Sequence, residues 1–493
     1  SSIGIKVKPI FVPMKPLSIL LVMFVYFLAV LALAKRTSRG ADNRSFFTGN
    51  RQSRWWLVSF GMVGASLSGV TFISVPGWVS SSSMAYMQMV LGYVLGYAVV
   101  AGVLLPLYYR SNSSTIYGYL GQRYNDLGQR SGAWLFLLSR WVGASLRLYL
   151  VAIVLQQLVF GPLGLPFALT VCLILSLIWL YTKHGGIQTV VITDVVQTLA
   201  MLGAIFYGLY VLTQQVDMGG LGAMDWLVAQ PESQWFFFDS TDGNHFWQQF
   251  LAGMFITIAM TGLDQDMMQK NLTCRSLRES QINVMSLSLV LVVVNFMVLA
   301  LGVLMTRFAS DHGIDASGDA LFPAVAMHAD MPWMLGILFV IGLVAAAFSS
   351  ADSALTALTT SLSVDVLRVE LMSTDKAKQV RQKAHVLVTI AVGALIVMLK
   401  PFADPSIIKT LFTAAGYTYG PLLGLFAYGI LSQQSPRQAW LIPAIAVTSP
   451  LLTYAVATLS PTILNYTFGF ELLLLNGALT MAMLALAPKA KHT

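Results

Sequence analysis

Acidic and hydroxyl side chains are concentrated at one place inside an otherwise apolar stretch of this sequence. Residues 345–353 read Ala-Ala-Ala-Phe-Ser-Ser-Ala-Asp-Ser and so contain Ser349, Ser350, Asp352 and Ser353. Because residues three and four apart share a face of a helix, Ser349 is predicted to lie beside Asp352 and Ser353. Hydroxyl, carbonyl and carboxylate oxygens are the donors that a small hard cation takes. Serines in apolar helices often bond only to their own backbone, but that alternative does not account for the carboxylate.

Two more charged residues stand in apolar surroundings and need a partner of opposite charge. Asp194 ends the segment 185–194, and it requires a cation or a proton beside it unless it caps a helix at an interface. Arg147 follows Arg140 by about two helical turns. We expect Arg140 to reach the aqueous boundary through its long side chain. Arg147 is too deep for that, so it should pair with an acid or bind an anionic substrate.

The composition places these residues in a membrane. The chain has 493 residues, of which 56% are hydrophobic and 10% are charged, and its mean hydropathy is +0.72. A soluble protein carries about 25% charged residues, so the sequence predicts a polytopic membrane protein. The net charge of +8 is explained by basic loops, which sets nucleic acid aside. The two cysteines, Cys172 and Cys274, provide neither a disulfide framework nor a metal site.

Stretches of about 20 apolar residues, each long enough to cross the hydrocarbon core, predict thirteen transmembrane helices. They cover residues 15–34, 55–79, 85–109, 133–158, 163–181, 188–212, 246–266, 282–306, 333–363, 385–400, 406–431, 438–457 and 466–487. With the N-terminus outside and the C-terminus inside, 21 of the 29 Lys and Arg fall in inward segments such as 182–187 and 267–281, the latter containing Lys270. The outward segment 213–245 has no Lys or Arg. This distribution obeys the positive-inside rule and supports the number of spans and their orientation.

Two of these spans are interrupted by glycine and hydroxyl residues. The second has three Gly, two Ser and one Thr between Gly61 and Thr71, and the seventh is interrupted between Gly253 and Gly262. Small residues also let two helices pack closely, which is the main alternative. The two spans, however, lie at matching places in two five-helix blocks of opposite orientation. Interrupted helices in that arrangement are typical of a transporter binding site.

Together these motifs resemble the sodium/solute symporter family over about residues 15–490. The most specific elements are Ser68–Phe72 with the preceding Gly64–Leu67, the segment from Gly185 to Asp194, and Ala346 to Ser353. The resemblance implies an all-α polytopic membrane protein with a LeuT-type core of ten helices in two inverted five-helix repeats. It places an external N-terminal tail and an accessory helix in 1–54, the repeats in 55–212 and 246–431, an external loop in 213–245, and two accessory helices with a cytoplasmic tail in 432–493.

The resemblance also implies where sodium binds. One site combines carbonyls at a broken helix with oxygens of a second helix, and the matching residues here are Gly64, Leu67, Ala346, Ser349 and Ser350. Some members hold a second sodium ion, for which the matching residues are Asp194, Ser349, Asp352 and Ser353. One or two Na+ ions are therefore expected. Asp352 is a carboxylate where some members have serine, which strengthens a second cation site or allows proton coupling.

Substrate positions are implied by the same resemblance. The residues that match or adjoin the family's substrate site are Ser66, Ser68, Thr71, Tyr86, Gln88 and Thr257. Arg147 lies on the helix from which a member that binds an acidic sugar uses an arginine. We therefore expect a carboxylate-bearing solute, such as sialic acid or a monocarboxylate, with a neutral sugar or amino acid as the alternative.

These observations favour sodium-coupled symport by alternating access in the cytoplasmic membrane. The sequence has no GxxxxGK[ST] motif for ATP hydrolysis. A membrane-embedded hydrolase using Asp194 and Asp352 is disfavoured because neither acid stands in a GxGD setting, so we do not expect an enzyme. A channel would instead conduct ions without a substrate, and a scaffolding or receptor protein would carry no solute flux. The expected partners are sodium, the solute and the lipid bilayer, with no obligate protein partner.

Overall fold

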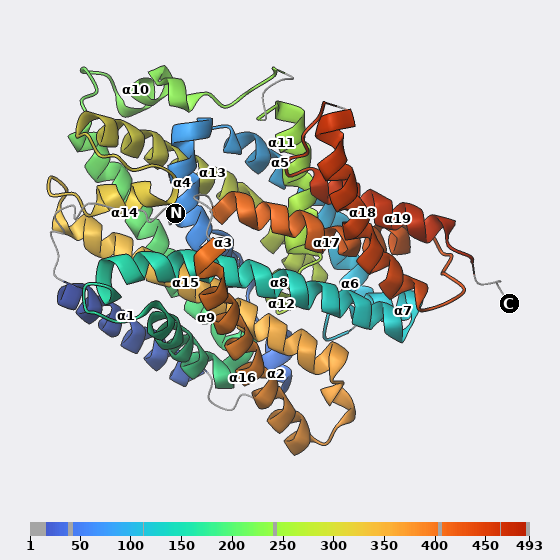
Figure 1. The fold of residues 1–493 in the computed structure, drawn as a ribbon. Coiled ribbons are helices and arrows are strands. Elements are labelled where there is room, and N and C mark those ends of the chain that lie inside the picture. Colours follow the sequence, from blue (N-terminus) through green and yellow to red (C-terminus); the bar gives the residue numbers. More distant parts are fainter. Residues whose placement is uncertain are drawn as a thin grey trace.

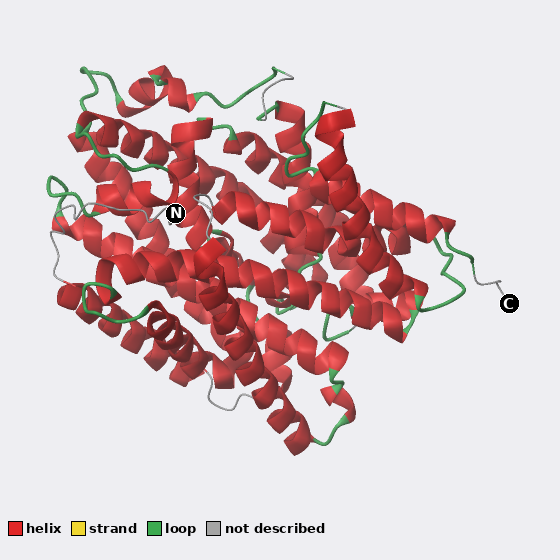
Figure 2. Cartoon of the chain, in the orientation of Figure 1, coloured by secondary structure: helices red, strands yellow, loops and turns green. Residues whose placement is uncertain are grey.

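The computed structural model describes residues 16–37, 43–111, 113–239, 244–402, 407–463 and 465–489, which are almost entirely helical (Figure 1, Figure 2). Strand-like pairing in those residues is confined to two isolated bridges, Ser53 with Cys274 and Pro436 with Lys489. Apolar segments of this length form helices because a helix satisfies the backbone hydrogen bonds within one segment. The prediction of an all-α protein is confirmed.

Over the described residues, each predicted span coincides with a helix, with half of a long helix or with a bent pair of helices. The first half of the chain contains α1 (Pro16–Thr37), α2 (Asn43–Thr48), α3 (Trp55–Ser66), α4 (Gly69–Ser82), α5 (Tyr86–Val99), α6 (Leu105–Ser111), α7 (Gly118–Tyr124), α8 (Asp126–Leu155) and α9 (Phe167–Gln215). The second half contains α10 (Ala223–Ala229), α11 (Phe246–Thr257), α12 (Gln265–Asn271), α13 (Leu277–Asp311), α14 (Leu321–Ala326), α15 (Trp333–Ser361), α16 (Thr374–Leu399), α17 (Ile407–Leu431), α18 (Leu441–Ile463) and α19 (Leu472–Leu486).

Within this part of the chain, eight helices are long and apolar enough to cross a membrane, or ten if each bent pair is one span. The shorter apolar helices Phe167–Lys183 and Leu472–Leu486 also coincide with predicted spans. The total of thirteen spans and their orientation stay predictions.

Both glycine-rich spans are broken, the first within the predicted stretch Gly61–Thr71 and the second directly after Gly262. The helix bends by 55° between α3 and α4, at Leu67 and Ser68. The second bend, of 69°, lies between the helical stretch Phe246–Gly262, which extends α11 by one turn of π-helix, and α12, next to Asp264. Close packing of helices, the alternative explanation for the glycines, also applies to part of the span 55–79. A Cβ on Gly64 would lie 2.2 Å from Oγ1 of Thr198 on α9. The glycine therefore allows close contact with α9, and the break itself follows three residues later.

The segment 182–187, predicted to connect two spans, contains the kink between the two helical halves of α9. Gly186 departs from helical geometry there, with φ of 51° and ψ of −143°. This left-handed φ favours glycine, and a Cβ there would lie 2.5 Å from the ring of Phe46. One glycine thus turns the chain between two spans and sets the start of the segment that carries Asp194.

α8 crosses the middle of the molecule and packs against α15, α16 and α17 (Figure 1). α15 also packs against α3, α4, α9 and α12, so it lies next to both broken helices. In Figure 1, α10 lies at one end of the molecule, and α2 and the start of α16 lie at the opposite end. This arrangement agrees with the opposite sides predicted for 213–245 and 364–384.

Candidate functional site

The hydroxyl-rich face of α15 lies against Asp194 on α9. The Ser349 hydroxyl donates a hydrogen bond to Asp194 Oδ1 at 2.6 Å, and Ser353 donates to the Ser349 carbonyl at 2.8 Å. Tyr181, also on α9, donates to Asp352 Oδ2 at 2.9 Å. The two aspartates and the two serines are all fully buried. The structure therefore brings together the acidic and hydroxyl residues that the sequence predicts to lie on neighbouring helices.

Lys270, predicted to lie in a basic inward loop, is buried in this cluster. It belongs to α12, its side chain is 1% exposed, and its Nζ lies 2.7 Å from Asp194 Oδ2. The prediction of a loop at Lys270 is wrong because the bend before α12 directs this short helix against α9 and α15. A buried ammonium group requires a partner of opposite charge, and Asp194 supplies it.

Arg140 does not reach the aqueous boundary, so this prediction is also wrong. It is 4% exposed and forms ion pairs with Asp264 and Asp266, at a distance of 3.6 Å between Nη1 and Asp264 Oδ2. Asp264 also caps α12 by accepting from the backbone N–H of Asp266 at 2.8 Å, and it accepts from the Tyr419 hydroxyl. Buried charges are tolerated only when they are paired and hydrogen-bonded, as these are.

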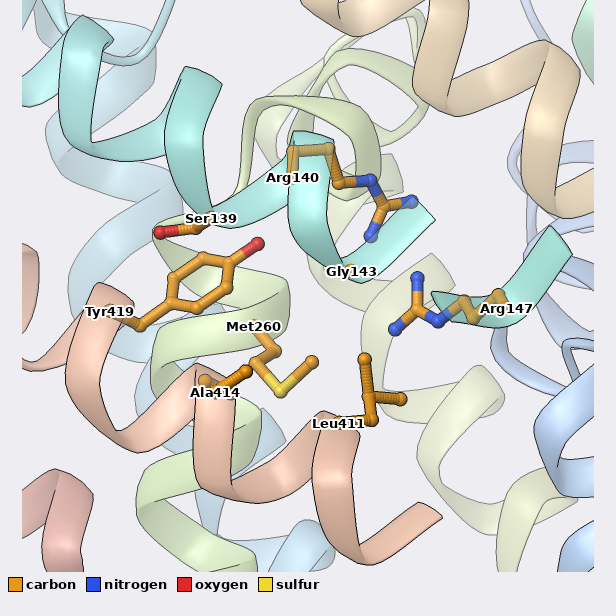
Figure 3. A pocket seen from close by; sticks show the side chains of 9 residues that line it. Ser139, Arg140, Gly143, Arg147, Met260, Leu411, Ala414 and Tyr419 are labelled. Carbon is orange, nitrogen blue, oxygen red and sulfur yellow. The ribbon is translucent and has the colours of Figure 1, made fainter. Parts of the chain in front are cut away.

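A cavity lies beside Arg140, between α8, α17 and the end of the α11 span (Figure 3). The cavity is small, with a volume of about 10 Å³, and its lining consists of Ser139, Arg140, Gly143, Arg147, Met260, Leu411, Ala414, Ala415 and Tyr419. Arg140 and Arg147 are seven residues apart and project from the same face of α8. In Figure 3 their guanidinium groups point toward each other.

The two arginines differ in their partners. Arg140 is compensated by Asp264 and Asp266, whereas Arg147 forms no ion pair within the described residues. A guanidinium group presents several N–H donors in a planar fork that matches a carboxylate. The cavity therefore offers an anion an arginine that has no ion-pair partner within the described residues.

The residues implied for the first sodium site lie on α3, at the break that follows it and on α15, which packs against α3. α3 ends at Ser66, so carbonyls in its last turn, such as that of Gly64, lack helical partners. α15 packs against α3, and the buried Ser350 hydroxyl has no hydrogen-bond partner within the described residues. Uncommitted oxygens from two helices are suitable ligands for a small hard cation, so the residues present fit a sodium ion.

Four residues predicted to bind the solute lie at or near the broken helices and do not line this cavity. They are Ser66, Ser68, Thr71 and Thr257. Ser68 is buried in the break itself, and the Thr71 hydroxyl donates to the Ser66 carbonyl at 3.3 Å across it. Thr257 packs against α5, where a Cβ on Gly96 would lie 2.6 Å from its side chain. Their predicted contact with the solute stays a prediction.

The two residues predicted on α5 are engaged by the protein. Tyr86 shares a 2.7 Å hydrogen bond with the Tyr93 hydroxyl. Gln88 donates to the Asn244 carbonyl at 2.8 Å and accepts from the Phe237 N–H at 3.1 Å. Gln88 thus links the segment before α11 to α5 through hydrogen bonds. It does not line the cavity beside Arg147.

Lys270, Asp266 and Tyr419 are members of the site that the sequence does not single out. The sequence does contain a signal for Asp266. This residue follows a glycine-interrupted span, and an acidic side chain is favoured in the first turn of a helix. Tyr419 stands in an apolar span with no charge beside it, so no local pattern marks it.

Comparisons with known proteins find the same architecture elsewhere. The family model "Sodium:solute symporter family" matches residues 46–444. The sodium/iodide cotransporter of Homo sapiens is 23% identical over 412 residues, which cover 81% of this chain and 62% of that protein. The sodium/sialic acid symporter of Proteus mirabilis (strain HI4320) is 23% identical over 434 residues, which cover 84% of each protein. A solved structure of a Na+-coupled sialic acid symporter, in a substrate-bound outward-open state, has a TM-score of 0.80 at 20% identity and covers 96% of this chain and 99% of its own.

These comparisons differ in what they establish. The structural likeness at 20% identity shows the fold, and it confirms the predicted fold class. This chain spans 62% of the length of the sodium/iodide cotransporter that it matches. The family model covers most of this chain, and the chain belongs to the sodium:solute symporter family.

Proposed function

We propose that this protein is a sodium-coupled secondary symporter that imports a small carboxylate-bearing solute across the cytoplasmic membrane, without an obligate protein partner. The observation that carries the proposal is Arg147. Its guanidinium group faces a cavity and has no ion-pair partner within the described residues, although the neighbouring Arg140 is paired with two aspartates. A positive charge at membrane depth without a protein partner is expected to serve an anionic substrate.

Sodium coupling is supported by the family and by the oxygen donors at the first helix break. The carbonyls of Gly64, Leu67 and Ala346 and the hydroxyls of Ser349 and Ser350 would hold the ion. Because these donors come from α3 and α15, binding of sodium favours the conformation in which the two helices are together. That conformation in turn fixes the unwound backbone at Leu67, and this is how ion binding would prepare the solute site.

The second helix break provides a hinge next to the cavity. Met260, in the last turn before the break, lines the cavity, and Arg140 binds the start of α12. The Tyr108 hydroxyl donates to the Gly262 carbonyl at 2.6 Å, and the Tyr117 hydroxyl donates to the Leu263 carbonyl at 3.0 Å. These bonds satisfy the backbone freed by the bend. Movement of α12 would exchange them and open the cavity toward one side at a time.

The charges of the sodium ion and of the solute set the order in which they bind during alternating access. External sodium binds first and stabilises the conformation open to the outside, and the solute carboxylate next binds Arg147. Closure around both is followed by release to the cytoplasm. A tenfold sodium gradient supplies about 1.4 kcal/mol, and a potential of 100 mV supplies about 2.3 kcal/mol for each net charge moved.

The named relatives support an anionic solute. One relative is named for iodide and another for sialic acid, and both solutes are negatively charged near neutral pH. The chemistry of the cavity favours a carboxylate, because the planar guanidinium fork of Arg147 can donate two parallel hydrogen bonds to it.

Uptake into proteoliposomes tests this function. Wild-type protein should accumulate labelled sialic acid or a short monocarboxylate under an inward sodium gradient and not under a potassium gradient. Arg147→Ala should lose this uptake, while Arg307→Ala, which changes an exposed arginine paired with Asp311, should keep it. Equal uptake in both gradients would rule out sodium coupling, and accumulation of neutral sugars or proline alone would rule out the carboxylate.

A further inference from the structure

Lys270 is the one lysine that is buried among the described residues, and it is bound to the carboxylate expected to hold a second sodium ion. Its Nζ lies 2.7 Å from Asp194 Oδ2, and the Ser349 hydroxyl donates to Asp194 Oδ1 at 2.6 Å. Both oxygens of Asp194 therefore have protein partners, and one of these partners carries a full positive charge.

The other side chains implied for the second sodium site are partly engaged. Ser353 donates to the Ser349 carbonyl at 2.8 Å, and its hydroxyl lies 3.3 Å from Asp266 Oδ2. Asp352 accepts from Tyr181 through one oxygen, and the other oxygen is buried without a hydrogen-bond partner in the described residues. That carboxylate lies within electrostatic range of both Asp194 and Lys270, so the ammonium group also supplies positive charge to it.

The two sodium sites implied by the family resemblance thus differ in what a free ion would displace. At the first, the Ser350 hydroxyl is buried with no hydrogen-bond partner in the described part of the chain. At the second, an ion that reached Asp194 would have to displace Lys270 and leave a buried ammonium without its carboxylate. Removing one partner of a buried ion pair is strongly destabilising, so the second exchange is disfavoured.

We infer that Lys270 is a built-in cation that takes the place of a second sodium ion, so that the protein binds one sodium ion in each cycle. The inference rests on the proposed sodium coupling, and it replaces the second sodium site implied at Asp194, Ser349, Asp352 and Ser353. Because the lysine is part of the chain, its charge does not cross the membrane. Transport of a monoanion with one sodium ion is then electroneutral.

Sodium binding to the purified full-length protein tests the inference. Equilibrium dialysis with radioactive sodium should give one ion per chain for wild type and for Lys270→Arg. Lys270→Met keeps an unbranched side chain of similar size and removes the charge, so it should bind two ions. The double variant Lys270→Met/Asp194→Asn, which lacks both charges, should return to one. Melting curves without sodium identify any variant that does not fold.

The outcomes separate this inference from the proposed function. Two ions on the wild type, or one ion on a folded Lys270→Met variant when the wild type also binds one, would overturn the role of Lys270 and leave sodium coupling intact. No ion on the wild type but one on Lys270→Met would support that role and refute sodium coupling. No ion on either would refute both. If Lys270→Met does not fold, the wild-type stoichiometry decides, with one ion supporting the inference and two overturning it.

Discussion

Replacing Arg147 with alanine should abolish recognition of the solute and leave the fold intact. Within the described residues Arg147 has no ion-pair partner, so the substitution strands no protein carboxylate in the membrane. This makes Arg147 a cleaner probe than Arg140, whose removal would leave Asp264 and Asp266 unpaired. The expected phenotype is therefore a folded protein that binds sodium and does not bind the anion.

The size of the effect follows from the proposed ion pair between the solute and the half-buried Arg147. Truncating one partner of a buried, hydrogen-bonded charge pair costs about 2–5 kcal/mol. A cost of about 3 kcal/mol raises Kd by about 150-fold, since each 1.4 kcal/mol is a factor of ten. Arg147→Lys keeps the charge but loses the planar fork, so we expect a weaker loss, about tenfold.

Isothermal titration of purified protein in saturating sodium measures these affinities. The titrant is the carboxylate that supports uptake, and the matched control is Arg307→Ala, because Arg307 is half exposed and its 3.2 Å pair with Asp311 lies within one helix turn. If Arg147→Ala binds the carboxylate within twofold of the wild type, Arg147 does not recognise the solute and the proposed site is wrong.

Three further predictions concern the ion site and the packing around it. Ser350→Ala removes a hydroxyl ligand worth about 1.5 kcal/mol, so the sodium concentration for half-maximal stabilisation should rise about tenfold; an unchanged sodium dependence would remove Ser350 from the site. Arg140→Ala breaks a buried ion pair, and a loss of about 3–5 kcal/mol should lower the melting temperature with or without solute; a variant as stable as the wild type would contradict the pairing. Gly64→Ala places a Cβ 2.2 Å from Thr198 Oγ1 and should cost about 1–3 kcal/mol of folding free energy. The double variant Gly64→Ala/Thr198→Ala should lose less free energy of unfolding than the sum of the losses in the two single variants. If the losses were strictly additive, the contact with Thr198 would not be the cause of the destabilisation by Gly64→Ala.

Features that depend only on local sequence could be predicted without the structure. Apolar length marks the spans, and glycine and hydroxyl clusters mark the two breaks, because both depend on a few consecutive residues. The family resemblance placed Asp194 and Ser349 in one implied sodium site, and the two side chains are in contact.

The partners of the basic residues could not be predicted in this way. Lys270 and Arg140 both stand near the predicted end of a span, where basic residues normally reach water. The 69° bend instead directs α12 back into the protein, and the direction of a bend depends on the packing of helices that are distant in sequence. Hydropathy counts residues along the chain and carries no information about that direction.

The most direct test of sodium-coupled carboxylate binding is the melting temperature of the purified wild-type protein in sodium and in potassium. Each salt is combined in turn with sialic acid, a short monocarboxylate, iodide, a neutral sugar and proline. We predict that sodium alone raises the melting temperature and that a carboxylate raises it further only when sodium is present. Equal melting temperatures in sodium and potassium, or further stabilisation by a neutral solute and not by any carboxylate, would contradict the proposal.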